Sequence, residues 1–276
     1  MNQFLPSRYV EIIHRLALGI EPLDAFRGAR LSYQLQAVYD AQQSGLPRPP
    51  IERHLSNLFS LRYQPGVATQ LDLFFLDSAE QVYRPEFDRR RVTPRRLGIP
   101  ILTLSDVETA EAVDKQGFNR RIRRPAFFPG AAYDFSATAT GMRGRVVRNG
   151  QPMRWARVTA TLSGSSVVVG HAHGDDRGEF LLLIGANVTT GSALPKPLEI
   201  EVSVFGPSPS PSPPTPELPR LDPLWDLPRE QLAAPGDPDP VAAGTALPPD
   251  YTAKVTRVIE FTLGKCLREE PEFVII

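Results

Sequence analysis

The sequence predicts an all-β protein built from two β-sandwiches, and three observations support this expectation. Several short segments alternate apolar with polar residues, which is the pattern of half-buried strands. Residues with turn chemistry separate these segments. Proline is abundant, at 29 of the 276 residues, which is about twice the average usage of about 5%. Because proline interrupts helices, few long helices are expected.

Length and composition allow two folded units, since a chain of 276 residues has room for two domains that each bury a core. Hydrophobic residues make up 41% and charged residues 22%, and the formal net charge is zero. This balance gives no global argument for binding nucleic acid or an acidic membrane. The only cysteine, Cys266, excludes an intramolecular disulfide framework and a multi-cysteine metal site, and we expect it to be a buried structural thiol.

The N-terminal β-sandwich is predicted over residues 1–104. Its clearest strand is 31–39, where apolar and polar residues alternate cleanly. The turn signal at residues 64–66, Gln-Pro-Gly, separates later strands. The other predicted strands are 11–18, where a helix is the alternative, 58–63, 70–76 and 98–102.

Residues 105–139 are predicted to hold a short helix and a connector. The helix is expected over 105–114, with Ser105 as N-cap and Glu108 at the capping-box position. An arginine-rich stretch then leads into the apolar segment 125–130, which we expect to pack between the two units.

The second unit is predicted over residues 140–276, with a hairpin turn at Asn149-Gly150 of the type that favours positive φ. Residues 206–250 change composition sharply and begin with alternating proline and serine, which predicts an extended or disordered Pro-rich insertion before the last strand. A long insertion is tolerable because the loop-closure cost grows slowly with length. The predicted strands are 142–147, 156–162, 167–171, 179–184, 198–205 and 253–263.

Residues 144–152, 156–158 and 175–180 carry a recognisable order of elements: Gly-x-Val, a Gly-x-Pro turn, Ala-x-Val, and an Asp-x-x-Gly-x-Phe hairpin. In this order the C-terminal half resembles the carboxypeptidase regulatory-like domain, a transthyretin-like or immunoglobulin-like β-sandwich. Gly178 supplies a positive-φ position, whereas Gly174 stands where that family usually has threonine. The resemblance implies an accessory sandwich without catalytic residues.

The whole chain, including the connector 123–134, also resembles accessory structural proteins of extracellular contractile injection systems, which are phage-tail-like particles. This resemblance implies a structural component whose partners are sheath, tube, cap or baseplate proteins, and it leaves homo-oligomerisation within the particle open. The sequence predicts neither a signal peptide nor a membrane span. We therefore expect assembly in the cytoplasm, with release as part of an extracellular particle as a further possibility.

An arginine cluster is the strongest local charge feature. Guanidinium groups suit carboxylate or phosphate partners, so we predict that the cluster, together with Trp225, binds an acidic surface of another protein. A solvated sheet edge is the alternative, and nucleic acid is disfavoured because no recognised nucleic-acid module accompanies the cluster. The predicted protein-binding residues are Arg89, Arg90, Arg91, Arg95, Arg96, Arg120, Arg121, Arg123, Arg124 and Trp225.

His171 and His173 project to one face of a predicted strand, and Asp175 and Asp176 follow them. Three or four converging ligands are needed for zinc, so a surface or hairpin role is favoured over a metal site. No nucleophile elbow, P-loop or dinucleotide fingerprint is present in the sequence. We therefore predict a non-enzymatic structural protein without a cofactor.

Two rival interpretations stay open. One is a carbohydrate- or protein-binding sandwich unrelated to such particles, with Trp155, Trp225 and Tyr251 as the aromatic residues that would contact a sugar. The other is an enzyme with an unfamiliar site built from the histidines of the preceding paragraph and Asp175.

Overall fold

The computed structural model describes residues 15–40, 50–63, 69–77, 89–113, 121–185, 197–235, 237–268 and 272–276. Strands dominate this part of the chain, which holds one ten-residue helix, α1 (Leu104–Val113), and one four-residue helix, α2 (Leu218–Leu221). The predicted all-β class is confirmed. Among the described residues, no helix is long and apolar enough to cross a membrane.

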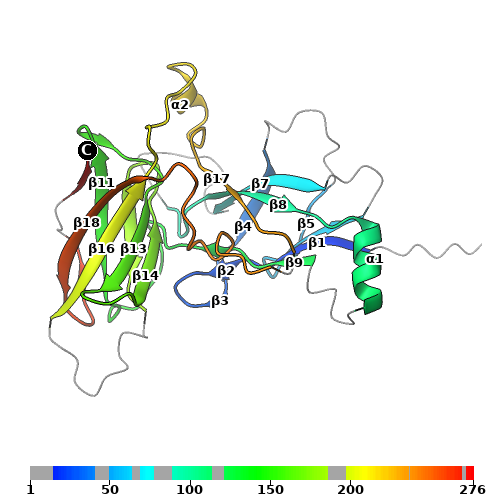
Figure 1. Cartoon of the computed structure of the whole chain (residues 1–276), viewed down its shortest axis with the longest axis horizontal. Helices are drawn as coiled ribbons and strands as arrows, with labels where there is room; N and C mark the ends of the chain where they lie inside the picture. Colours follow the sequence, from blue (N-terminus) through cyan, green and yellow to red (C-terminus); the bar gives the residue numbers. More distant parts are fainter. Residues whose placement is uncertain are drawn as a thin grey trace, which may run out of the picture.

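The N-terminal half contains three small sheets, which lie on the right in Figure 1. The first has the strand order β5-β6-β1-β9, the second β10-β2-β3 and the third β17-β8-β7-β4. The strands are β1 (Leu16–Ile20), β2 (Leu23–Asp24), β3 (Ala29–Arg30), β4 (Leu35–Tyr39), β5 (Glu52–Arg53), β6 (Phe59–Arg62), β7 (Gln70–Asp77), β8 (Arg95–Pro100), β9 (Ile122–Arg123), β10 (Ala126–Phe127) and β17 (Arg229–Gln231).

The C-terminal half contains two sheets. One has the order β14-β13-β16-β18, and in the other the long strand β11 pairs with β12, β15, β19 and β20. The strands are β11 (Gly141–Arg148), β12 (Gln151–Pro152), β13 (Arg157–Leu162), β14 (Val168–His173), β15 (Glu179–Leu183), β16 (Leu198–Gly206), β18 (Ala253–Phe261), β19 (Cys266–Leu267) and β20 (Phe273–Ile275).

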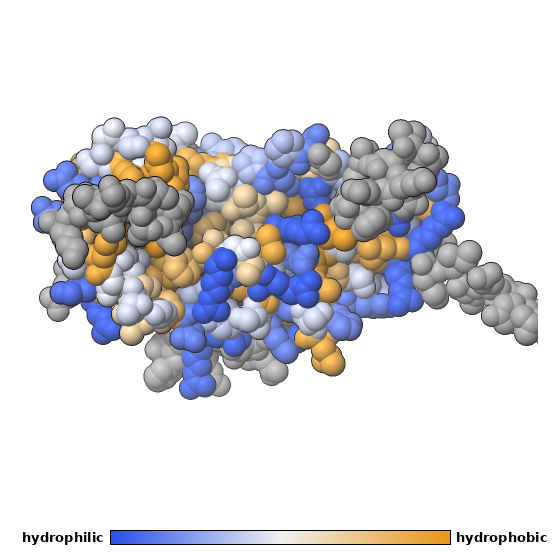
Figure 2. All heavy atoms as spheres, turned by 90° about the horizontal axis from the view of Figure 1, so that it is seen from below, coloured by the Kyte–Doolittle hydropathy of each residue, from blue (hydrophilic) through white to orange (hydrophobic). Residues whose placement is uncertain are grey.

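The strand β15 joins two hydrophobic cores. Phe180 and Leu182 belong to the core of the C-terminal half, whereas Leu181 and Leu183 belong to the core of the N-terminal half. This division follows from the alternation of side chains along a strand, and it explains why the sequence there is a continuous apolar run. The two halves are in continuous contact on the face seen in Figure 2, where hydrophobic surface is interspersed with hydrophilic residues.

Most predicted strands are present with shifted ends. The predicted strand 31–39 begins at Leu35 in β4, and the predicted strand 98–102 begins earlier, at Arg95 in β8. Residues 11–14 and the predicted turn 64–66 lie outside the described residues. Cys266 is half-buried in β19, where burial raises the pKa of its thiol.

The predicted capping box of the helix is wrong by two residues. Thr103 is the capping residue, because its Oγ1 accepts a hydrogen bond from the Asp106 main-chain N–H at 3.1 Å. Ser105 lies inside α1, and its carbonyl accepts a bond from the Thr109 hydroxyl at 3.0 Å. Thr103 and Ser105 are both residue types that cap helices, and Leu104 between them does not indicate which of the two is the N-cap.

Residues 207–252 connect the neighbouring antiparallel strands β16 and β18 and, apart from residue 236, are described throughout. The segment, yellow to orange in Figure 1, crosses from the C-terminal half to the N-terminal half and returns. On the way it supplies β17, which pairs in parallel with β8 through Glu230 and Leu97. The Pro-rich segment therefore adds a strand to a sheet of the N-terminal half, which the sequence did not predict.

Two predicted backbone positions are confirmed. Asn149 and Gly150 have φ values of 51° and 73°, as the hairpin turn requires. Gly178 has a φ of 74°, and a Cβ atom there would lie 2.5 Å from the carbonyl oxygen of Val146. Glycine at 178 is therefore needed both for its conformation and for the space that it leaves.

We predict that Gly178→Ala lowers the free energy of unfolding by more than about 2 kcal/mol, because a left-handed conformation alone costs about 1–2 kcal/mol and the overlap with Val146 adds to it. Gly150→Ala is the matched control, since Gly150 has a similar φ of 73° with no atom within 4 Å of the new Cβ. Urea unfolding of both variants measures the difference. Equal losses would contradict the steric argument.

Candidate functional site

A buried carboxylate bridges the two halves of the molecule. The carboxylate of Glu230 in β17 accepts a hydrogen bond from Nε of Arg95 in β8 at 2.9 Å. It accepts a second hydrogen bond from Nη2 of Arg157 in β13 at 3.2 Å. The three side chains are 0%, 3% and 5% exposed for Arg95, Glu230 and Arg157. The triad joins the N-terminal half, the 207–252 segment and the C-terminal half at one point.

Main-chain carbonyl groups supply further partners for the two arginines, while Nε of Arg157 is enclosed without a hydrogen-bond partner among the described residues. Arg95 also donates to the carbonyls of Ala126 at 2.8 Å and Ala242 at 3.0 Å, and Arg157 donates to the carbonyl of Trp155 at 2.8 Å. Burial by itself raises the pKa of the Glu230 carboxyl, but the charges and hydrogen bonds of the two arginines outweigh it and hold the pKa below its usual value. Glu230 is therefore ionised at neutral pH.

The other predicted arginines are largely engaged inside the molecule. Arg90 pairs with Asp176 at 2.6 Å across the two halves, and Arg123 pairs with Asp239 at 2.8 Å. Arg91 pairs with Asp77 and Arg96 with Asp40, Arg121 donates to the carbonyl of Leu16 at 3.1 Å, and Arg124, which is half-exposed, pairs with Glu21 at 2.8 Å.

The predicted docking surface is therefore wrong in part. Arg90, Arg95, Arg121 and Arg123 are each less than 10% exposed, so they face the interior and not a partner protein. Arg89 is exposed, and Arg120 lies outside the described residues. Trp225 is half-buried in the 207–252 segment, and its indole Nε1 is enclosed without a hydrogen-bond partner among the described residues. The predicted cluster does not form one exposed patch.

His173 is fully enclosed at the junction. The surface part of the predicted surface or hairpin role is therefore wrong for this residue, which ends β14 just before the turn to β15. Its ring stacks on Phe128 with centroids 3.8 Å apart. Burial, then the charges of Arg157 and Arg95, hold the pKa of His173 well below its usual value. Its Nε2 lies 3.2 Å from the carbonyl oxygen of Gly244, and since a carbonyl only accepts, the proton of the neutral ring is on Nε2.

His171 and Asp175 do not join His173 in a metal site. His171 contacts the hydroxyl of Thr159 through Nδ1 at 3.4 Å, and Asp175 pairs with Arg177 at 2.8 Å within the hairpin. In the described part of the chain, no group of three or more His, Cys, Asp and Glu side chains could hold a metal ion.

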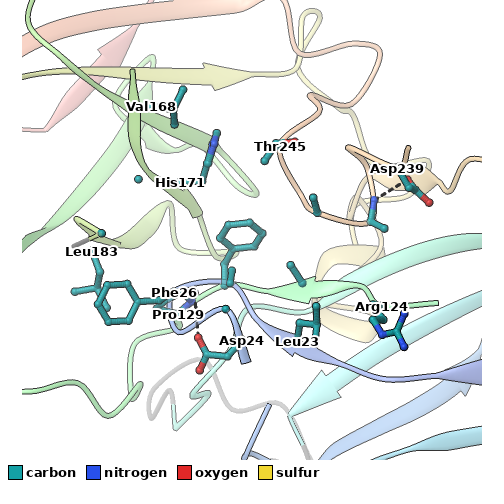
Figure 3. Close-up of a pocket in the computed structure, with 18 of the residues that line it drawn as sticks. Leu23, Asp24, Phe26, Arg124, Pro129, Val168, His171, Leu183, Asp239 and Thr245 are labelled. Atoms are coloured by element: carbon teal, nitrogen blue, oxygen red, sulfur yellow. Dashed lines mark hydrogen bonds between the residues drawn. The ribbon is translucent and has the colours of Figure 1, made fainter. Parts of the chain in front are cut away.

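A cleft of about 780 Å³ lies beside the buried triad. Figure 3 shows its walls: Val168 and His171 come from β14, Thr245 and Asp239 from the 207–252 segment, and Leu23 and Phe26 from the N-terminal half. The cleft was not predicted from the sequence, because each wall is a short stretch and the three stretches are far apart in the chain. Nothing local in any of them signals a cavity.

Four of the five charged groups that line the cleft have partners within the molecule, and the fifth, Asp237, is exposed and has no side-chain partner among the described residues. Arg123 pairs with Asp239, Arg124 pairs with Glu21, and the buried carboxylate of Asp24 accepts bonds from the main-chain N–H groups of residues 26 and 27 and from the hydroxyl of residue 133. Burial lowers the pKa of His171, which favours its neutral form. The walls are therefore mainly apolar, and among the described lining residues the carboxylate of Asp237 stays available to a polar or basic group.

Comparison with known proteins finds no match: no protein-family model, curated protein or solved structure shows significant similarity to this chain.

We predict that Glu230→Gln lowers the free energy of unfolding by about 3–5 kcal/mol, because removing one partner of a buried ion pair leaves uncompensated charge. Glu52→Gln is the control, since Glu52 pairs with Arg62 at the surface, where the side chains are 50% and 47% exposed. Such a pair contributes at most about 1 kcal/mol. Denaturant unfolding measures both, and an equal effect of the two substitutions would show that the triad is not needed.

We also predict that the protein loses stability as the pH falls below about 6.5, the ordinary pKa of histidine. Unfolded His173 takes up a proton there whereas the folded residue does not, so unfolding is favoured by up to about 1.4 kcal/mol per pH unit for one proton. Thermal unfolding at pH 7.5 and 5.5 measures the effect. His173→Phe should reduce this dependence. An unchanged dependence in His173→Phe would contradict the assignment.

Proposed function

We propose that this chain is a non-enzymatic structural protein that docks onto other proteins of a contractile, phage-tail-like particle. The observation that carries the proposal is the buried Arg95–Glu230–Arg157 triad, which ties two halves and a long connecting segment into one body. A component that holds its neighbours in fixed positions needs such a rigid body. The resemblance of the whole chain to accessory proteins of these particles points to the same role.

We further propose that each half is a β-sandwich and that the C-terminal one is transthyretin-like. Two sheets contribute to the core of the C-terminal half, with Ile200 and Phe261 from one and Phe180 and Phe273 from the other. Facing sheets with a shared apolar interior are the essential feature of a sandwich. The confirmed turn at Asn149 and the positive φ of Gly178 belong to the motif that suggests this family.

Protein binding is favoured over carbohydrate binding as the docking chemistry. Trp155 and Tyr251 are only 2% and 6% exposed, so these two aromatic side chains do not form an exposed platform for a sugar. The mainly apolar cleft described above is instead suited to a segment of another protein.

Deleting the chain from the cell that produces it tests the proposal. We expect the wild-type chain to co-purify with sheath and tube proteins, and we expect its deletion to alter particle assembly in negative-stain images, with restoration by the wild-type chain. Mass spectrometry of purified particles identifies the neighbours. Particles that lack the chain in the wild type, and that have normal number and sheath length in the deletion strain, would refute the particle role.

A further inference from the structure

One edge of the strand β14 lines the cleft. This strand is the outermost strand of its sheet and pairs only with β13 among the named strands. The consecutive residues Val168, Val169, Gly170 and His171 all line the cleft. Since successive side chains of a strand point to opposite faces, a space that touches all of them lies along the edge of the strand and not over one face.

The register of the strand pair shows where unpaired main-chain groups lie. The Gly174 N–H donates to the Ala156 carbonyl at 2.7 Å, and the alternation of an antiparallel ladder then places the next hydrogen-bonded pairs at Ala172 and Gly170. His171, opposite Thr159, is at a non-hydrogen-bonded position. Its main-chain N–H and C=O therefore point away from β13, toward the cleft.

Within the described residues, no main-chain or side-chain group bonds to the N–H or C=O of His171. The neighbouring outward group is already used, because the Val169 carbonyl accepts a bond from the Gly185 N–H at 2.8 Å. An unpaired donor and acceptor on an edge strand are a template for another strand. His171 thus offers a pair of bonds that an incoming chain can complete.

The opposite walls of the cleft set the chemistry of what fits. They present Leu23, Phe26 and Ile122 from the N-terminal half, and Ala242 and Ala243 from the 207–252 segment. Four of the five charged lining groups have the partners described above, and Asp237 leaves one carboxylate for a polar or basic side chain of the occupant. The cleft volume of about 780 Å³ lies within the range of about 300–1,000 Å³ that is usual for ligand sites.

We propose that this cleft binds an extended, mainly apolar segment of a partner protein, which adds to the edge of β14 as a further strand. The main chain of the segment bonds to the N–H and C=O of His171, and its apolar side chains contact the opposite walls. In strand addition the main-chain bonds supply affinity and the pockets for side chains supply specificity. The inference rests on the proposed function only in that both require a protein partner.

Photocrosslinking in the producing cell tests the proposal with the full chain. A p-benzoylphenylalanine residue replaces Ala243, which is exposed and lines the cleft, or in a control Ala137, which is exposed and is not among the lining residues. We expect crosslinks from position 243 to map to one contiguous partner segment with alternating apolar residues, and no such crosslink from position 137. No crosslink from 243, or crosslinks scattered over many proteins, would overturn the proposal.

Two substitutions at His171 test the main-chain bond. His171→Pro removes the outward N–H without removing a bond to β13, and proline is tolerated on edge strands. We expect it to lower the crosslinking yield by about tenfold, through the lost bond and the altered edge. His171→Ala keeps the N–H and should retain the yield within about twofold. An equal loss in both variants would assign recognition to the imidazole and overturn strand addition, and circular dichroism confirms that both fold.

The outcomes separate this inference from the proposed function. If the chain is present in particles but position 243 gives no crosslink, the cleft proposal fails and the structural role stands. If position 243 crosslinks to an extended segment of a protein that belongs to no particle, the particle role fails and the cleft proposal stands. Cleft occupancy by a small molecule, seen by native mass spectrometry with no crosslinked protein, would also overturn the cleft proposal.

Discussion

The position of one carboxylate organises this molecule. Glu230 is enclosed between two arginines, and a carboxylate buried without such partners would be expected to change its protonation state instead of remaining charged. The arginines come from β8 and β13, which lie in different halves, and the carboxylate comes from a third segment. Neither half by itself supplies the full set of partners. The fold is therefore constrained to bring three distant parts of the chain together before any of these charges is compensated.

A buried ion pair is weak support for stability, because the cost of desolvation can cancel the attraction between the charges. Its effect here is better understood as specificity. The pairing of Glu230 with Arg95 helps to fix the register of the three-residue strand β17 on β8. Arg229 pairs with Asp72 at 2.7 Å and Gln231 accepts a bond from Gln70 at 2.9 Å, so all three residues of β17 contribute to its alignment. Gly98 contributes as well, since a Cβ atom there would lie 2.5 Å from the side-chain oxygen of Gln231. Electrostatics and close approach together select one alignment.

The sequence predicted those elements whose determinants are local. Alternation located β4 and β7, and the Asn149-Gly150 pair located its hairpin. It did not predict β2, β3, β9 or β10, because strands of two residues are too short for a periodic pattern. It also assigned the arginines to the surface, because a run of like charges in sequence does not reveal that several of them have separate acidic partners elsewhere in the chain. The cleft could not be predicted for the same reason, since its walls are defined only by the tertiary contacts.

The return of the 207–252 segment closes the junction and also forms one wall of the cleft. Where the 207–252 segment returns over β14, Gly244 adopts a φ of 70° and lies so close to Phe128 that a Cβ atom would be 2.3 Å from the ring. This close approach seals one end of the junction around His173, while the stretch of β14 before it keeps an uncovered edge. Because both walls are held by buried contacts, an incoming segment would meet a preformed surface and lose little free energy in ordering it. The rigidity on which the proposed structural role rests would thus also prepare the edge strand for the proposed partner.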